Sequence, residues 1–196
     1  MERLRDKHEQ IYEAAVAEFQ ERGFADASMD RISERAGASK RTVYKHFESK
    51  EKLFKEIVRR HWSRFAASLD VTYEPSRNIR DQLTALGQAE GVLMTSPEVM
   101  SMTRLVISEL LRNPDLVEEN QEKTDYKAAF ETMLRDATAD GQLNVADPRV
   151  AAEEYIGLIK AKAFWPVVLG APVVTAAEMD DIIESSVALI MSRYGT

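Results

Sequence analysis

The chain has 196 residues, 44% of them hydrophobic and 30% charged, an ordinary globular composition that suffices for one sizeable core or two smaller ones. It has no cysteine, which excludes disulfides and thiolate chemistry and leads us to expect a cytoplasmic protein. The first ten residues are highly charged and the longest apolar run, 163–174, contains two prolines, so neither a signal peptide nor a membrane span is predicted.

The first predicted helix covers residues 5–22. Its apolar residues Ile11, Ala15 and Phe19 recur at i, i+4 and i+8, the spacing that places side chains on one helix face. Gly23 follows at the position where a left-handed cap is expected, because glycine adopts that conformation without steric cost. We therefore expect the helix to end there, with the next residue folding back onto its last turn.

Two short helices and a longer one are predicted next. Ser28 and Ser39 are suited to cap the short helices, because a serine hydroxyl accepts a hydrogen bond from a free N–H group of the first turn. Gly37 separates these two helices. Ser49 is expected to cap the longer helix, whose apolar positions keep a helical period as far as Leu69.

The remainder of the chain also has a helical period, and no alternating strand pattern or fixed repeat is present. Prolines and glycines divide it into segments. The sequence thus predicts an all-α protein of about nine helices, the later ones over residues 79–94, 97–112, 116–140, 148–165 and 176–194.

The positive charge of the chain is concentrated in one segment. The net charge is −7, yet residues 38–60 hold eight Lys and Arg against three Glu, which leaves the rest of the chain at −12. This asymmetry is typical of a protein in which one part contacts phosphates and the rest stays away from them. A solvated helix face that happens to be basic would give the same count.

The two short helices have the proportions of a helix-turn-helix, in which the second helix enters the major groove of DNA. Arg41 is suited to a bidentate contact with guanine, and Tyr44 to a backbone contact. A helical hairpin without any role in DNA binding would show the same spacing. The predicted DNA-binding residues are Ser39, Lys40, Arg41, Thr42, Tyr44, Lys45, His46 and Lys50.

Residues 30–54, DRISERAGASKRTVYKHFESKEKLF, resemble the signature of the tetracycline-repressor (TetR) family, as do Ala14-Ala15, Phe19 and Gly23-Phe24 upstream. The resemblance implies a three-helix DNA-binding domain, here 1–48, followed by a helical effector-binding and dimerisation domain, here 49–196. It also implies phosphate contacts by Thr42, Tyr44, His46 and Lys50, and positions near bases for Lys40, Arg41 and Lys45. The family commonly has glycine where this chain has Arg41, so that residue could add a contact that its relatives lack.

The second half resembles the effector domains of an AefR-like or AcrR-like subgroup through residues 104–109, Gly141-Gln142-Leu143, Asp147-Pro148 and Phe164-Trp165-Pro166. This resemblance implies a cavity for a small molecule, which adaptable Met and aromatic side chains would suit if that molecule is largely apolar. Any one of these residues could instead be plain core. The candidate ligand-binding residues are Trp62, Phe65, Met94, Met102, Leu105, Tyr126, Phe130, Phe164 and Trp165.

The last two long helices have broad apolar faces. In the family, the corresponding helices pair across a two-fold axis, so the resemblance implies a homodimer that reads a pseudo-palindromic operator in double-stranded DNA. The same faces could pack only within one chain. The candidate dimer-interface residues are Tyr155, Ile156, Ile159, Ala163, Ile183, Val187 and Ile190.

Catalysis is not predicted. The chain has no glycine-rich phosphate loop, Gly-x-Ser-x-Gly or His-Glu-x-x-His motif, and its three histidines lie within the first 61 residues, so neither a metal site nor a cofactor is expected. The function predicted is a ligand-responsive transcriptional regulator, a repressor released by its effector. The alternatives are an activator of the same fold and a helical small-molecule carrier without regulatory DNA binding.

Overall fold

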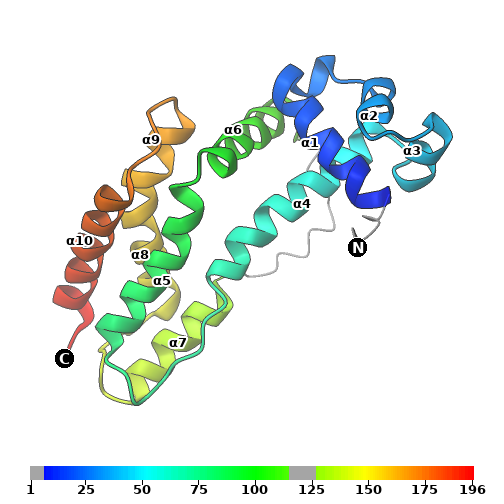
Figure 1. Cartoon of the computed structure of the whole chain (residues 1–196). Helices are drawn as coiled ribbons and strands as arrows, with labels where there is room; N and C mark the ends of the chain where they lie inside the picture. The colour runs from blue at the N-terminus through cyan, green and yellow to red at the C-terminus, as the bar shows by residue number, and fades with distance from the viewer. Residues whose placement is uncertain (1–6, 115–126) are drawn as a thin grey trace, which may run out of the picture. The chain divides into compact units, whose positions relative to one another are not determined.

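The computed structural model describes residues 7–114 and 127–196, and these form helices without any named strand (Figure 1). The all-α prediction is confirmed. Within the described ranges the helices are α1 (Lys7–Asp26), α2 (Met29–Arg35), α3 (Lys40–His46), α4 (Lys50–Ser68), α5 (Ile79–Met94), α6 (Pro97–Arg112), α7 (Ala128–Ala139), α8 (Pro148–Ala163), α9 (Trp165–Val168) and α10 (Ala176–Tyr194).

Two helix boundaries differ from the predictions. Gly23 has φ 74° and ψ 171°, which kinks α1, but a further turn follows it and the helix ends at Asp26. Phe24 does fold back, and its ring centroid lies 5.7 Å from that of Phe19. Near residue 164 the predicted break contains a single additional turn, α9. The first part of the helix predicted over 116–140 lies outside the described residues.

The described residues divide into two compact units. The N-terminal unit comprises 7–62 and 101–114, and the C-terminal unit comprises 63–100 and 127–196. Neither unit is continuous in sequence, because the division falls inside α4 and again inside α6. The boundary therefore differs from the one predicted between residues 48 and 49. No helix in the described ranges is long and apolar enough to span a membrane.

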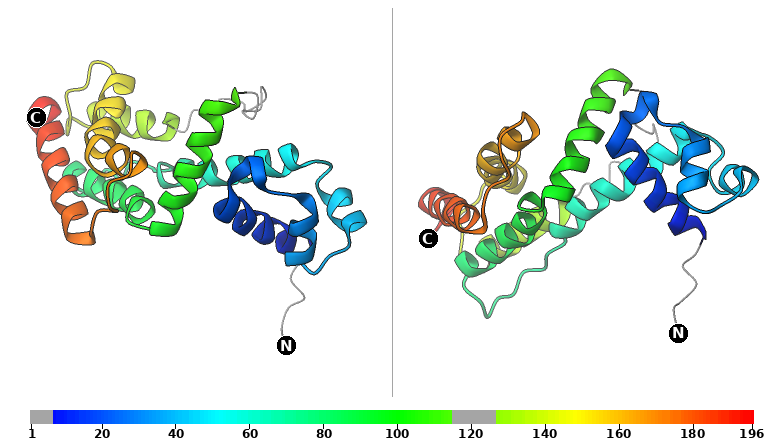
Figure 2. Two further views of the ribbon diagram at one scale, coloured as in Figure 1. Left: turned by 90° about the horizontal axis from the view of Figure 1, so that it is seen from above. Right: turned by 45° about the horizontal axis from the view of Figure 1, so that its top comes forward.

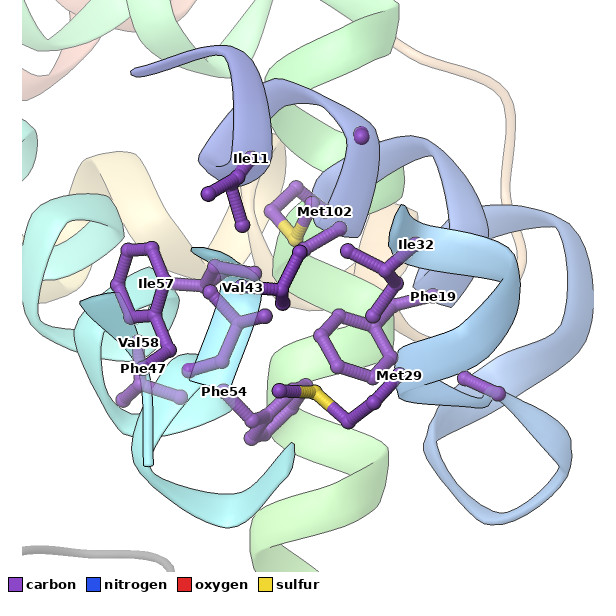
Figure 3. Close-up of a cluster of buried hydrophobic side chains, with 14 of the residues drawn as sticks. Ile11, Phe19, Met29, Ile32, Val43, Phe47, Phe54, Ile57, Val58 and Met102 are labelled. Carbon is purple, nitrogen blue, oxygen red and sulfur yellow. The ribbon is translucent and has the colours of Figure 1, made fainter. Parts of the chain in front are cut away.

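The N-terminal unit encloses its own hydrophobic core (Figure 3). Phe54 of α4 lies at its centre, with ring centroids 5.3 Å from Phe19 and 4.9 Å from Phe24. Met102 and Val106 from α6 complete this core, so α6 belongs to it as much as the first four helices do. The other buried members are Ile11, Ala14, Ala15, Ala27, Met29, Ile32, Val43, Phe47, Leu53, Ile57 and Val58.

In the C-terminal unit, α10 packs against α5 and α8, and α7 packs against α8 (Figures 1 and 2). Glycines on α5 permit this close packing. A Cβ atom added at Gly87 would lie 2.6 Å from the hydroxyl oxygen of Tyr155 and 2.9 Å from Ile183, and one at Gly91 would lie 2.9 Å from Met179. The Tyr155 hydroxyl donates a hydrogen bond of 2.6 Å to the carbonyl oxygen of Leu83, which fixes α8 on α5.

Replacing Gly87 with alanine is expected to destabilise the C-terminal unit by about 1–3 kcal/mol, the usual cost of overpacking a core. This loss outweighs the roughly 1 kcal/mol by which alanine favours a helix over glycine. Because the clash is with the Tyr155 hydroxyl as well as with Ile183, the destabilisation should be smaller when measured in a Tyr155→Phe background. Urea unfolding of both single variants and the double variant would measure this coupling. Additive effects of the two substitutions would contradict it.

Candidate DNA-binding surface and effector region

The N-terminal unit contains the predicted helix-turn-helix. The side chain of Ser28 accepts a hydrogen bond from the Arg31 N–H group at the start of α2, and that of Ser39 accepts one from the Thr42 N–H group at the start of α3. Gly37 lies between the helices with φ 55°, in the left-handed region that favours glycine. The sequence therefore places a sharp turn and a new helix start where the motif requires them, and the structure confirms both.

Helix α2 is held on α1 by a buried carboxylate. Glu18 is 1% exposed and accepts a hydrogen bond of 2.5 Å from the guanidinium of Arg31. Arg22 and Arg35 lie 3.8 and 3.9 Å from the same carboxylate, and Arg35 also makes a two-fold contact with Glu21. A buried charge is tolerated where opposite charges and hydrogen bonds surround it, so this cluster fixes the position of α2 beneath α3.

Four of the predicted DNA-binding residues are exposed on α3: Arg41, Tyr44, Lys45 and His46. Tyr44 is 48% exposed, which is unusual for so large a ring without a partner surface. Within the described parts of the chain, neither Arg41 nor Lys45 forms an ion pair. Their charges are thus available to a ligand in solvent, as a DNA-reading helix requires.

Lys40 and Thr42 already make contacts at the start of α3. The Lys40 ammonium lies 2.6 Å from a carboxylate oxygen of Asp30, and this hydrogen bond raises the pKa of the lysine above its usual value. Both side chains are exposed, and a pair of this kind contributes about 0.2–1 kcal/mol, so a phosphate could replace the aspartate. The hydroxyl groups of Ser39 and Thr42 lie 2.8 Å apart, with Ser39 serving mainly as the helix cap.

Lys50 differs from its predicted role. Its ammonium donates to the backbone carbonyl oxygens of Phe24, Ala25 and Ala27 at 2.8, 3.1 and 3.2 Å, and it lies 4.6 Å from the centre of the Phe24 ring. An ammonium has three N–H donors, so all of them are used inside the protein. The expected phosphate contact is therefore revised: Lys50 ties the α1–α2 connection to the start of α4.

Replacing Lys50 with methionine is expected to lower the free energy of unfolding by about 1.5–3 kcal/mol, the range for hydrogen bonds to a charged group. Methionine keeps an apolar stem of similar length, so the loss reports on the ammonium. The salt dependence of DNA binding should stay unchanged, whereas Lys45→Ala should reduce its slope by about one. Urea unfolding and binding titrations at several salt concentrations would test both points. A Lys50→Met variant of normal stability with a reduced salt slope would restore the phosphate contact.

Three predicted ligand-binding residues lie in the N-terminal unit instead of an effector site. Met102 is part of that unit's core, and Leu105 and Trp62 pack against it. His61 beside Trp62 is also occupied, since its ring nitrogen lies 2.9 Å from the Thr103 hydroxyl. The helical period identified these side chains as apolar but could not tell which core they join, so the prediction was wrong for these three. Tyr126 lies outside the described residues.

The other predicted ligand-binding residues lie in the C-terminal unit. Phe65 and Phe164 are buried with ring centroids 6.0 Å apart, and Phe130 lies 5.5 Å from Tyr155. Met94 is also buried, while Trp165 is half exposed. These residues form an aromatic interior, but whether a ligand touches them stays a prediction.

The sequence analysis overlooked Glu90, which is fully buried in this interior. Neither of its carboxylate oxygens has a hydrogen-bond partner, and burial raises the pKa of this carboxyl above its usual value. A signal was present in the sequence, because Glu90 follows Leu83 and Leu86 at i+7 and i+4 on the apolar face of α5. An acid on such a face indicates either a buried partner or a function.

A cavity of about 290 Å³ opens in the C-terminal unit. Leu86 and Ala89 of α5 and Met133 of α7 contribute apolar surface, whereas Asp70, Glu74, Arg77 and Gln82 make the opposite side polar. None of the predicted ligand-binding residues lines it. Its remaining walls come from Ala67, Ser68, Val71, Thr72 and Ala85.

The predicted dimer-interface residues are buried within a single chain. Each of them is at most 5% exposed, because α8 and α10 use these faces to pack against each other and against α5. They cannot contact a second chain, so the prediction of these residues was wrong. The residues corrected are Tyr155, Ile156, Ile159, Ala163, Ile183, Val187 and Ile190.

No group of three His, Asp or Glu side chains within 7–114 and 127–196 is arranged to hold a metal ion.

Two family models match the chain. Residues 11–57 match the model described as bacterial regulatory proteins, tetR family, and residues 81–196 match the C-terminal domain of AefR-like transcriptional repressors. The first match covers the helix-turn-helix, and the second covers more than half of the chain, including the whole aromatic interior around Glu90.

Individual relatives agree with these matches. The transcriptional repressor SCO4008 of Streptomyces coelicolor is 30% identical over 161 residues, 81% of this chain and 77% of the relative. The transcriptional activator FasR of Mycolicibacterium smegmatis is 32% identical over 84 residues, 43% of this chain and 38% of the relative. The crystal structure of a TetR family transcriptional regulator from Pseudomonas syringae aligns over 98% of both chains with 35% identity and a TM-score of 0.79.

Proposed function

Because the chain belongs to the TetR family of transcriptional regulators, we propose that it represses transcription as a homodimer bound to a pseudo-palindromic operator and leaves that operator when a small, largely apolar effector binds its C-terminal unit. As a DNA-binding regulator it would act in the cytoplasm. The proposal assigns no catalytic step and no cofactor to the chain.

The observation that carries the DNA-binding part is the exposed surface of α3. Arg41, Tyr44 and Lys45 project from a helix whose start is capped and whose base is fixed by the Glu18 cluster. A rigid helix with exposed cationic and aromatic side chains supports a reading in which Arg41 contacts a base and Tyr44, Lys45 and His46 contact phosphates or sugars. Lys40 and Thr42 would join these contacts once DNA displaces their present partners.

Selection of bound fragments from fragmented genomic DNA, followed by titration of the best fragment and a scrambled copy at two salt concentrations, would test this proposal. We expect tight binding to the selected fragment, weak binding to the scrambled one, and a loss of affinity with salt, since each neutralised phosphate releases counterions. The selected fragments should share an inverted repeat, because a two-fold dimer presents two identical reading helices. Equal, weak binding to all fragments would favour the carrier alternative.

The effector part is supported by the buried aromatic side chains of the C-terminal unit. Phe65, Phe130 and Phe164 offer the apolar contacts that pockets for small organic molecules use. A ligand can release DNA only by its difference in affinity for the two conformations of the protein. Effector binding should therefore weaken operator binding, and operator binding should weaken effector binding by the same factor.

The homodimer would use the outward faces of α8 and α10, in place of the buried faces predicted from sequence. Ala161, Ala188 and Leu189 are exposed there, and Leu158 and Ile182 are half-buried, so this surface combines small and apolar residues. Close packing of helices across a two-fold axis favours such a composition. The relatives' family supports the pairing of these helices between chains.

Replacing Leu189, 51% exposed, with arginine is expected to convert the dimer to a monomer, because it would bury an unpaired charge at the interface twice. The mass in solution, measured by light scattering after size-exclusion chromatography, would show the change, and operator affinity should fall with it. Leu111→Arg is the matched control, since Leu111 is 79% exposed on α6 in the N-terminal unit. A Leu189→Arg variant that keeps the dimer mass would exclude this face.

Activation in place of repression is the second candidate, and one relative, FasR, is named an activator. Reporter transcription from the selected operator, with and without the regulator, would distinguish the two.

A further inference from the structure

Glu90 lies in the interior of the C-terminal unit without any partner for its carboxylate. The residue is fully buried, and neither oxygen accepts a hydrogen bond from any described residue. A buried polar group without a hydrogen bond costs free energy, so such groups are rare unless they serve a purpose. The ion-paired Glu18 of the N-terminal unit shows how this chain treats a buried carboxylate that has only a structural role.

The groups nearest to Glu90 do not satisfy it. Gly87 and Gly91 flank it on α5, and their lack of side chains brings Tyr155, Met179 and Ile183 close to the helix. The Tyr155 hydroxyl is near enough for the Glu90 charge to raise its pKa further, yet it donates its proton to the carbonyl of Leu83. The one neighbouring hydroxyl is therefore committed to the backbone.

Lys160 is the nearest cation on α8. Burial lowers its pKa, and the charge of Glu90 opposes that effect, so the two groups influence each other. The lysine nevertheless forms no hydrogen bond to the carboxylate. Its ammonium lies 5.8 Å from the ring centre of Phe164, which contacts Phe65 in turn.

The surroundings of the carboxylate are otherwise apolar and aromatic. Phe130 packs against Tyr155, and Phe65 packs against Phe164. The 290 Å³ cavity reaches the same helix, since Leu86 and Ala89 line it, and Leu86 is one helical turn before Glu90. A molecule that enters from this cavity and extends along α5 would meet the Glu90 carboxyl next.

We propose that Glu90 is the polar anchor of the effector site and that the effector is a small aromatic or aliphatic molecule carrying a hydrogen-bond donor, either a protonated amine or a hydroxyl group. This inference rests on the proposed function, because it specifies the ligand of the same regulator. The donor would supply the partner that the carboxylate lacks. A protonated amine would form the stronger, charge-assisted bond, whereas an acidic effector would place a second negative charge beside a buried carboxyl.

Four probes of one shape would test the ligand chemistry: 4-butylbenzylamine, 4-butylphenol, butylbenzene and 4-butylbenzoate. Their affinities for the full-length protein would be measured by calorimetric titration. We expect the amine or the phenol to bind at least about tenfold more tightly than butylbenzene, which corresponds to roughly 1.4 kcal/mol. The benzoate should bind most weakly. Equal affinities for butylbenzene and both donors, or no saturable binding by either donor up to its solubility limit, would overturn the proposal.

Two substitutions at Glu90 would assign the effect to this residue. Glu90→Gln keeps the shape but loses the charge, and Glu90→Met also removes the acceptors. Both should abolish the advantage of the amine over butylbenzene, and Glu90→Met should raise the melting temperature of the unliganded protein by removing an unsatisfied polar group. Asp81→Asn, an exposed acid on the same helix, is the matched control and should bind the probes as the wild type does. An unchanged ranking of the probes in both Glu90 variants, as expected if a buried water satisfies the carboxyl, would overturn the proposal.

Operator binding separates this inference from the function on which it rests. All Glu90 and Asp81 variants should bind the selected operator as the wild type does when no probe is present, because these residues lie outside the N-terminal unit. Specific DNA binding without Glu90-dependent probe binding would remove the anchor and leave the regulator. Glu90-dependent probe binding without specific DNA binding would retain the ligand site and overturn the proposed function.

Discussion

A Phe54→Ala substitution is expected to abolish operator binding by unfolding the N-terminal unit. Phe54 is fully buried, and its ring contacts those of Phe19 and Phe24 at the centre of the core shown in Figure 3. Truncation of a buried phenylalanine to alanine costs about 3–5 kcal/mol. Such a loss is comparable to the whole stability of a small unit, since entire domains are stable by only about 5–15 kcal/mol.

Circular dichroism during urea unfolding would measure the effect of Phe54→Ala, and operator titration would follow on the same samples. Phe54→Leu is the control, since it keeps most of the apolar volume and should cost clearly less. The C-terminal unit has its own core, so probe binding at the effector region should survive in Phe54→Ala under mild conditions. A Phe54→Ala protein that unfolds less than about 1 kcal/mol more easily than the wild type would contradict this account.

Arg41→Ala is expected to produce the largest loss of operator affinity that leaves the protein folded. A bidentate contact from arginine to guanine contributes roughly 1–3 kcal/mol, and a homodimer would lose it at both half-sites. The side chain is exposed and forms no ion pair within the described residues, so the stability of the N-terminal unit should stay unchanged. Binding to scrambled DNA should change much less than binding to the operator.

Fluorescence anisotropy with operator and scrambled DNA would test this expectation. Lys45→Ala is the matched control, because removing a phosphate contact should weaken binding to both DNAs alike and reduce the salt slope. If Arg41→Ala instead lowered the two affinities equally, Arg41 would be a backbone contact. An unchanged operator affinity would place Arg41 outside the interface altogether.

Local signals in the sequence were sufficient for the helix-turn-helix. The caps Ser28 and Ser39 and the turn residue Gly37 act within three or four residues of their own position, so their chemistry is readable without a fold. The exposure of Arg41, Tyr44 and Lys45 also follows locally, because the buried Val43 fixes which face of α3 points inward.

Features that depend on distant partners could not be predicted in this way. The carbonyl oxygens that hold Lys50 lie 23–26 residues earlier, and nothing at Lys50 itself distinguishes them from phosphates. The apolar faces of α8 and α10 were identified correctly as apolar. A helical period cannot say whether the surface covering such a face belongs to the same chain, and here Ile159 and Ile190 are covered from within.

The participation of α6 in the N-terminal core limits how this protein can be recombined with its relatives. Met102 and Val106 complete that core from a segment about fifty residues after the helix-turn-helix. A chimera that exchanges only residues 1–48 for those of another regulator would place these two side chains against a foreign core. To transfer the operator specificity of one regulator to the other effector response, a crossover would have to exchange the second half of α6 as well, or introduce compensating substitutions at Met102 and Val106.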